Sequence, residues 1–258
     1  MNSLRRKSQL VRCIGACILA CFAINCGAYQ GPQQLTDAEI IQRIDAAVHV
    51  RTQSVASYTV QELYSIYRNG ETIPSVQVTI KTAYNRATGK DYTPIAQSGP
   101  SILRSLVIEH ILSNEKEMAK ASNRDSVALT TANYEMHPEP GKVMMDGREC
   151  IIVDLKAKRK ISYLFNGKGW YDLADFTLVH IEGSPAASPS FFVGATHGHR
   201  DYTNIDGFSM ARHAELQSHS FLFGNTLMKI DYSNYQIQLD PTAAGSNSTA
   251  NRANLPTP

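Results

Sequence analysis

Cysteine is almost absent from this chain after its first 26 residues. Four of the five cysteines precede residue 27, and Cys150 is the only one that follows. A domain with a single cysteine cannot form an internal disulfide, so its stability must come from packing. Cys150 itself begins the apolar run 150–153, where we expect a buried, unreactive thiol.

Long apolar runs are scarce as well. The longest at the N-terminus, residues 13–24, is shorter than the about 20 residues that a membrane-spanning helix needs. It follows a basic stretch and ends in the small residues Cys26-Gly27-Ala28, which is typical of a secretory signal peptide. We therefore predict a signal peptide over residues 1–28, a linker over residues 29–34, and a periplasmic or otherwise exported protein.

A second processing route stays open. Residues 18–21, Ile-Leu-Ala-Cys, resemble a bacterial lipobox, in which the cysteine is acylated and becomes the first residue. Cleavage there would leave an apolar run of only residues 13–20, near the lower end of the about 7–15 residues of a signal peptide. A lipid anchor at Cys21 is therefore the alternative to cleavage after Ala28.

An excess of positive charge is also missing from the exported part. The leader holds four of the 25 basic residues and none of the 23 acidic ones, so 21 basic and 23 acidic residues remain and the net charge is −2. This balance argues against a nucleic-acid partner.

The composition predicts one globular domain over residues 35–239, because 43% of the chain is hydrophobic and only 19% is charged. A capping box at Thr36 and Glu39 starts a helix with an apolar face. Apolar residues then alternate with polar ones over residues 58–68 and 76–84, which predicts two paired strands joined at Asn69-Gly70.

Residues 143–237 carry the strongest pattern. Short runs rich in Val, Ile, Tyr and Phe are separated by Gly-containing turns at residues 146–147, 166–169, 206–207 and 224–225, which indicates an antiparallel meander. Residues 100–121 and 123–134 predict two helices between the early strands and this meander. We expect nine or ten strands in all and a disordered tail over residues 240–258, which is rich in Ala, Gly, Ser, Asn, Thr and Pro.

A series of short motifs follows along the chain in this order: Ala132-Asn133-Tyr134, Asp146-Gly147-Arg148, Tyr163-Leu164-Phe165-Asn166-Gly167, Trp170-Tyr171-Asp172, Ile181-Glu182-Gly183, Pro189-Ser190-Phe191-Phe192, and Ile230-Asp231-Tyr232 with Tyr235. In this order the motifs resemble those of the outer membrane lipoprotein-sorting protein family, the LolA-like proteins, and the resemblance covers residues 35 to 238.

This resemblance implies a mainly β fold with helices (α+β), in which a strongly curved antiparallel sheet forms a half-open barrel and helices cover its concave face. It also implies a carrier that shields lipid or lipoprotein acyl chains in an apolar cavity, with transient or peripheral membrane contact. Such a carrier needs no catalytic residue and no cofactor, because burying methylene groups is itself the function. The apolar start of the 100–121 helix is a candidate lid.

We expect the cavity wall to come from inward-facing apolar and aromatic strand residues, although ordinary core packing would give the same pattern. Glu62 shares the side of Tyr58 and Tyr64, so that face is partly wet or the strand bulges. The candidate ligand-binding residues are Tyr58, Val60, Tyr64, Ile66, Val78, Ile80, Tyr84, Trp170, Phe192 and Met210.

Other functions find weaker support in the sequence. His197 and His199, with His213 and His219 on the next strand, suggest a metal site, but no Cys or Glu reinforces it, and we predict no metal. Ser190 and Ser209 lack the Gly-x-Ser-x-Gly elbow of a serine hydrolase. The remaining alternative is a monomeric envelope domain that binds another envelope protein through its sheet and has no cavity.

Overall fold

The computed structural model describes residues 35–101, 104–188, 193–220 and 224–241. The predicted signal peptide, linker and most of the predicted tail lie outside these ranges, and so do Ser190 and Phe192. None of the helices in the described ranges is long and apolar enough to cross a membrane.

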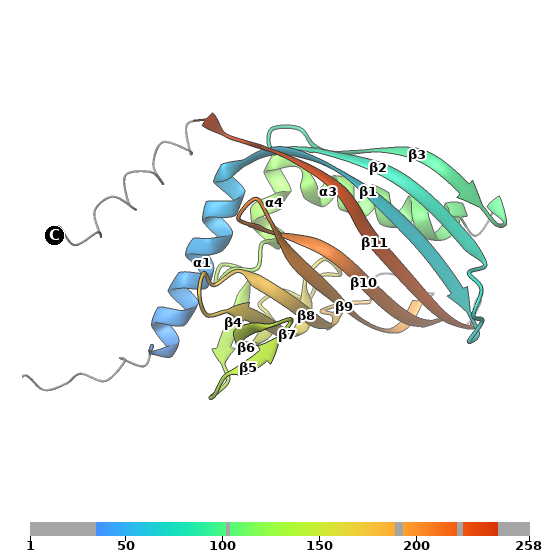
Figure 1. The fold of residues 1–258 in the computed structure, drawn as a ribbon. Helices are drawn as coiled ribbons and strands as arrows, with labels where there is room; N and C mark the ends of the chain where they lie inside the picture. The colour runs from blue at the N-terminus through green and yellow to red at the C-terminus, as the bar shows by residue number, and fades with distance from the viewer. Residues whose placement is uncertain (1–34, 102–103, 189–192, 221–223, 242–258) are drawn as a thin grey trace, which may run out of the picture. The chain divides into compact units, whose positions relative to one another are not determined.

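Eleven strands and a small set of helices make up the described chain (Figure 1). The helices are α1 (Asp37–Ser54), the π-helix η1 (Arg104–Glu109), α3 (His110–Ala119) and α4 (Ala121–Val127). The strands are β1 (Val55–Arg68), β2 (Val76–Asn85), β3 (Gly89–Ser98), β4 (Tyr134–Pro138), β5 (Val143–Met145), β6 (Arg148–Ala157), β7 (Phe165–Asp172), β8 (Leu178–Pro185), β9 (Val193–Ile205), β10 (Phe208–Ser220) and β11 (Gly224–Leu239).

All the strands form one antiparallel sheet in the order β3-β2-β1-β11-β10-β9-β8-β7-β6-β4, with β5 paired to β6. The two ends of this order, β3 and β4, do not pair with each other, so the sheet is open. The first and last strands of the chain, β1 and β11, are neighbours near its middle, as Figure 1 shows.

The sheet is strongly curved around its helices. In a flat sheet β3 and β9 would lie about 24 Å apart, because neighbouring strands are about 4.8 Å apart. Yet Glu115 of α3 accepts a hydrogen bond from Lys90 of β3 at 2.8 Å and lies 4.0 Å from the guanidinium of Arg200 on β9. One helical side chain reaches both strands because the sheet curls around it. The predicted fold class, a curved antiparallel sheet with helices on its concave face, is therefore confirmed.

Three of the predicted Gly-containing turns join strands as expected. Residues 69–70, 146–147 and 206–207 all have positive φ angles and connect β1 to β2, β5 to β6 and β9 to β10. Such pairs of left-handed residues match the twist of a hairpin, which is why Asn-Gly and Asp-Gly occur there.

The turn predicted at residues 166–169 is wrong, because these residues lie inside β7. A Cβ atom on Gly167 would lie 1.9 Å from the carbonyl oxygen of Glu182 on β8. Glycine is present here because the two backbones approach closely, not because the chain turns. Within the predicted meander residues 160–164 form no strand, and the predicted 123–134 helix begins at Ala121 and ends at Val127.

Two apolar cores fill the two ends of the concave face. In the first, Ile40 and Ile44 of α1 pack against β4, β6 and β7. In the second, Ile108 of η1 packs against β1, β2, β10 and β11. The even-numbered side chains of β1 face this second core, which answers which face of that strand points inward.

Candidate functional site

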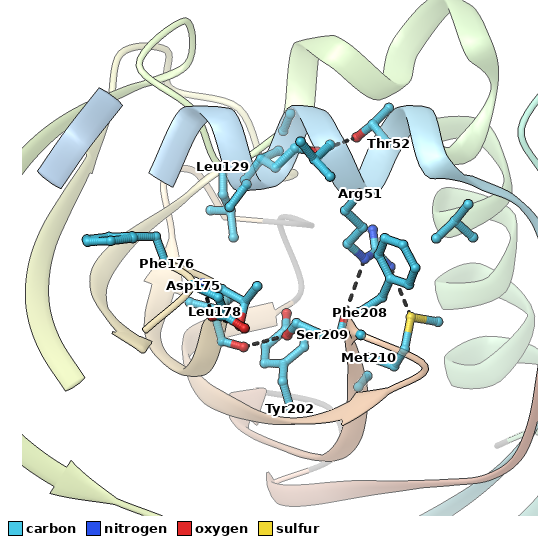
Figure 2. Close-up of a pocket in the computed structure, with 18 of the residues that line it drawn as sticks. Arg51, Thr52, Leu129, Asp175, Phe176, Leu178, Tyr202, Phe208, Ser209 and Met210 are labelled. Carbon is cyan, nitrogen blue, oxygen red and sulfur yellow. Dashed lines mark hydrogen bonds between the residues drawn. The ribbon is translucent and has the colours of Figure 1, made fainter. Parts of the chain in front are cut away.

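An open cavity of about 740 Å³ lies between the two cores, lined by α1, α4, the end of α3 and residues of strands β1 to β3 and β7 to β11. Ligand pockets typically enclose about 300 to 1,000 Å³, so the space is large enough for a small molecule or an acyl chain. Figure 2 shows Leu129, Phe176, Leu178 and Phe208 around it. Small and branched side chains of α1 complete the apolar wall: Ala46, Ala47, Val48 and Val50.

The start of α1 is fixed by the predicted capping box. The Glu39 amide donates to the Thr36 hydroxyl at 3.3 Å, and the Thr36 amide donates to the Glu39 carboxylate at 2.8 Å. The hydrogen bonds that the Thr36 amide and hydroxyl donate to the Glu39 carboxylate lower its pKa. Because Ile40 and Ile44 hold the first turns in a core, the last turns of α1 are left to cover the cavity.

Arg51 closes the end of the cavity where α1 meets β10. Its Nε donates to the Ser209 carbonyl at 3.1 Å, and its Nη2 lies 3.7 Å from the sulfur of Met210, as drawn in Figure 2. The Ser209 hydroxyl in turn donates to the carbonyl of Leu178 at 2.5 Å. The last turn of α1 is thus attached to the sheet by polar contacts across an apolar space.

Three tyrosines form the wall on the side of β1. The rings of Tyr58 and Tyr84 stack with centroids 4.8 Å apart, and the ring of Tyr235 is tilted against Tyr58 at 6.0 Å. The Tyr235 hydroxyl donates to the Ala211 carbonyl at 2.8 Å. Burial raises the pKa of Tyr235, so this phenol stays neutral and acts as a donor.

A second, smaller cavity of about 400 Å³ adjoins the first and includes Ile111 of α3 and Leu164 in its lining. The two cavities share Val127, Leu129, Arg200 and Tyr202. Because these shared side chains form the boundary between the two spaces, a rotation of one of them would join the cavities.

A charged cluster lies beside this boundary. Glu115 is bonded to Lys90 and to the Tyr92 hydroxyl, which donates at 3.1 Å, and Arg200 is nearby. Burial opposes ionisation of Glu115, but the charges of Lys90 and Arg200 outweigh it and lower its pKa to about 2. Glu115 therefore remains charged and ties α3 to both sides of the curved sheet.

Glu62 is the other acid on the concave face and is only 2% exposed. It accepts a hydrogen bond of 2.6 Å from the Tyr64 hydroxyl. The bulge suggested for β1 at this point is absent: β1 pairs with β2 in continuous register, and the shift in its pairing with β11 between Thr59 and Gln61 comes from an extra residue in β11. Burial raises the pKa of Tyr64, which keeps that hydroxyl protonated as the donor to Glu62.

The predicted ligand-binding residues divide into separate groups. Tyr58, Tyr84 and Met210 line the larger cavity. Five others are buried and do not line it: Val60, Tyr64, Ile66, Val78 and Ile80. Four of those five belong to the core around Ile108, so the same alternation gave packed residues more often than cavity walls.

Trp170 does not line the cavity either. Its ring packs edge-on against His180, with centroids 4.9 Å apart, while its neighbour Tyr171 points to the concave face and lines the cavity. Phe192 lies outside the described residues. The candidate lid is also displaced from its expected position, because Ile108 is buried in a core and the helices that border the larger cavity are α1, α4 and only the last residue of α3, Ala119.

The histidines lie on the face of the sheet opposite Arg200. The ring of His199 lies between those of His180 at 5.5 Å and His213 at 6.1 Å. His180 and His213 are hydrogen-bonded to Asp201 at 2.6 Å and Asp231 at 2.7 Å, which gives an alternating row across β8 to β11. No cluster of three metal-ligating side chains occurs among the described residues.

The remaining candidate nucleophiles, Ser209 and Cys150, lie in surroundings that do not activate them. The Ser209 hydroxyl donates to a backbone carbonyl, so no base activates it there. Cys150 is buried, and burial together with the charge of Asp172 raises the pKa of its thiol to about 11. A thiol with that pKa stays protonated at neutral pH, in agreement with the predicted unreactive state.

Comparison with known proteins found similar folds only at low sequence identity. No family model matches the chain, and no curated protein matches it. Among solved structures, a LolA superfamily protein from Nitrosomonas europaea is 11% identical over 81% of this chain and 96% of that one, with a TM-score of 0.42. A putative outer membrane lipoprotein-sorting protein domain from Vibrio parahaemolyticus is 11% identical over 80% and 98%, with a TM-score of 0.39.

These proteins are of the family that the sequence resembles. A DUF1329 family protein from Desulfovibrio piger, 14% identical over 77% of this chain and 93% of that one, has a TM-score of 0.39. Because the TM-scores are below 0.5, these similarities give no conclusion about function, which has to come from the residues of this chain.

Several cavity residues were not found from the sequence. Leu129 and Phe176 come from connections between strands and helices, where no periodicity marks an inward face. Arg51 and Arg124 lie on helices that the sequence did predict, but only the packing of those helices on the sheet brings the arginines to the cavity. The one available signal was the position of Arg51 in the last turn of a capped helix.

Proposed function

We propose that this chain is an exported, non-enzymatic carrier or binder of lipid or lipoprotein acyl chains in the bacterial envelope. The observation that carries the proposal is the cavity of about 740 Å³ between two packed cores, whose wall is mostly apolar and aromatic. Each methylene group moved from water into such a space contributes about 0.8 kcal/mol, so sequestration needs no reaction.

The arrangement of helices suits uptake and release. The N-terminal half of α1 is held by a core, whereas its last turn is attached to β10 by the hydrogen bonds of Arg51. Polar contacts of this kind can exchange for water at a low net cost, since a typical hydrogen bond contributes about 0.5–1.5 kcal/mol. We therefore place the entrance at the C-terminal end of α1 rather than at the residue 100–121 segment.

Export follows from the leader in the sequence. Cleavage after Ala28 would release the carrier into the periplasm, and acylation of Cys21 would hold it at a membrane surface. Either route places the protein beside the lipids or lipoproteins that it would bind, as a monomer in transient contact with the membrane. An interaction domain without a cavity is the alternative, and the open space between the cores argues against it.

The test is whether the protein carries lipid when it is isolated. The full chain is purified from the envelope of a bacterial host and analysed by native mass spectrometry, before and after incubation with fatty acids or lipopeptides. We expect adducts with the mass of a fatty acid, phospholipid or lipopeptide. Protein that is consistently empty and takes up none of the added compounds contradicts the proposal.

A matched pair of variants locates the bound lipid. Ala211 lines the cavity, whereas Ala83 is exposed on the other face of the sheet. Ala211→Trp should fill the space and remove most of the adduct, and Ala83→Trp should leave it in place. Ala174→Trp at the exposed rim is a second filling variant, and circular dichroism confirms that each variant is folded.

A further inference from the structure

The larger cavity carries a positive charge that its own residues do not balance. Five basic side chains line it, and Asp175 is the one acid in the described lining. Glu115, just outside this lining, is paired with Lys90 and lies near Arg200. The other three cations are Arg43, Arg51 and Arg124, which have no carboxylate within ion-pair distance among the described residues.

Arg124 makes only neutral contacts. Its Nη1 donates to the Tyr84 hydroxyl at 2.7 Å and to the Arg86 carbonyl at 2.9 Å. Its Nε is buried and has no acceptor in the described chain. A guanidinium that is drawn away from water usually has a carboxylate or phosphate partner, because its desolvation is otherwise uncompensated.

Arg51, an exposed residue of the last turn of α1, is also bonded only to neutral groups at the other side of the tyrosine wall. Its guanidinium contacts the Ser209 carbonyl and the Met210 sulfur, both uncharged. Tyr58, Tyr84 and Tyr235 lie between the two arginines: Arg124 is bonded to Tyr84, and Tyr235 is bonded to Ala211, the neighbour of Met210. A phenolic hydroxyl can donate a hydrogen bond to an anion, whereas the faces of its ring are apolar. The tyrosine wall is therefore polar at its hydroxyls and apolar at its rings.

We propose that the ligand of this cavity is an anionic amphiphile, with its acyl chain among Leu129, Phe176 and Phe208 and its carboxylate or phosphate beside Arg51 and Arg124. The inference rests on the proposed function and specifies the chemistry of the head group. An uncharged acyl chain would leave Arg124 and Arg51 without a charged partner, whereas a carboxylate or phosphate gives both of them a charged acceptor.

The experiment compares probes that share one acyl chain and differ in head group. Myristate and myristoyl lysophosphatidic acid carry a carboxylate and a phosphate, monomyristoylglycerol is uncharged, and inorganic phosphate has no chain. Binding of each to the lipid-stripped full chain is titrated by calorimetry below the micellar concentration. We expect both anionic amphiphiles to bind about tenfold or more tightly than monomyristoylglycerol, a difference of about 1.4 kcal/mol, since a charged acceptor strengthens the hydrogen bonds of a guanidinium.

Variants assign the discrimination to the two arginines. The readout is the ratio of the affinity for myristate to that for monomyristoylglycerol, which does not depend on how much of a preparation is folded. Arg51→Gln and Arg124→Gln should each bring this ratio toward one. Arg212→Gln is the matched control, because Arg212 is paired with Asp146 and does not line the cavity.

The outcomes separate this inference from the proposed function. Equal binding of charged and uncharged amphiphiles overturns the inference and leaves acyl binding standing. Binding of none of the three amphiphiles overturns both. If inorganic phosphate binds as tightly as lysophosphatidic acid, the site recognises small anions, and the proposal that its ligand is an amphiphile is overturned. A ratio unchanged in both arginine variants overturns the assignment to Arg51 and Arg124.

Discussion

At the scale of single residues, the polar side chains of the concave face are the ones that distinguish this chain from an ordinary β core. Glu62 and Glu115 lie among tyrosines and cations on a face that also holds Tyr64, Ile66 and Ile80. Buried polar groups are retained where they are paired, and these are paired. Glu115 fixes α3 against the sheet, and Glu62 is held by Tyr64 of its own strand.

Glu115 gives this cluster a pH dependence with a definite sign. Its pKa is about 2 in the folded chain and 4.5 as its ordinary value. A carboxyl group with a lowered pKa stabilises the fold above its ordinary pKa and loses that contribution as the pH falls toward the folded value. We therefore expect the free energy of unfolding to decrease between pH 4.5 and pH 2, in part through Glu115.

Urea unfolding of the Glu115→Gln variant measures how much Glu115 contributes to this loss of stability at low pH. The variant should be less stable at neutral pH, because Lys90 and Arg200 lose their charged partner, and its stability should fall less steeply below pH 4.5. Lys142→Gln, which removes the exposed Lys142–Glu149 pair, should change little. Equal slopes for Glu115→Gln and the wild type would show that Glu115 is not held in its charged form by these partners.

At the scale of elements, strand alternation and turn chemistry were the parts that sequence could predict. Asn69-Gly70 and Asp206-Gly207 adopt the left-handed conformation that their residue types favour. The edge strand β3 and the short β4 were missed, since β3 has mostly exposed side chains and contains Pro94 and so lacks the alternation of a half-buried strand. Local pattern fails where an edge strand is solvated on both faces.

Gly167 is the glycine whose role the sequence concealed. A Cβ atom there would meet the β8 backbone, so Gly167→Ala should force β7 and β8 apart and reduce stability by about 3 kcal/mol. For a domain of this size each kcal/mol of lost stability lowers Tm by about 2–4 °C, and calorimetry measures this fall.

Gly70→Ala serves as the comparison for this substitution. Gly70 has a φ of +82° and open space around its Cβ position, so alanine there meets only the conformational cost of about 1 kcal/mol. Equal losses for the two variants would mean that the contact between β7 and β8 is not the reason for glycine at position 167.

At the scale of the whole described domain, the sequence predicted the kind of sheet but not how its interior is used. Ten candidate residues were chosen by alternation, and the structure puts Tyr58, Tyr84 and Met210 at the cavity while Tyr64 and Ile80 are packed in a core. Alternation says which side chains face inward. Whether that inner space is filled depends on where η1, α3 and α1 rest on the sheet, which is a matter of tertiary packing.

The proposed function requires that an acyl chain occupies the cavity between the two cores. A crystal structure of the full chain with a fatty acid brominated near its methyl end tests this most directly, because bromine can be located by its anomalous scattering. We predict a single bromine site between α1 and strands β8 to β11, in contact with Leu129, Phe176 or Phe208. Bromine found only on the outer face of the sheet, with the cavity free of lipid, would contradict it.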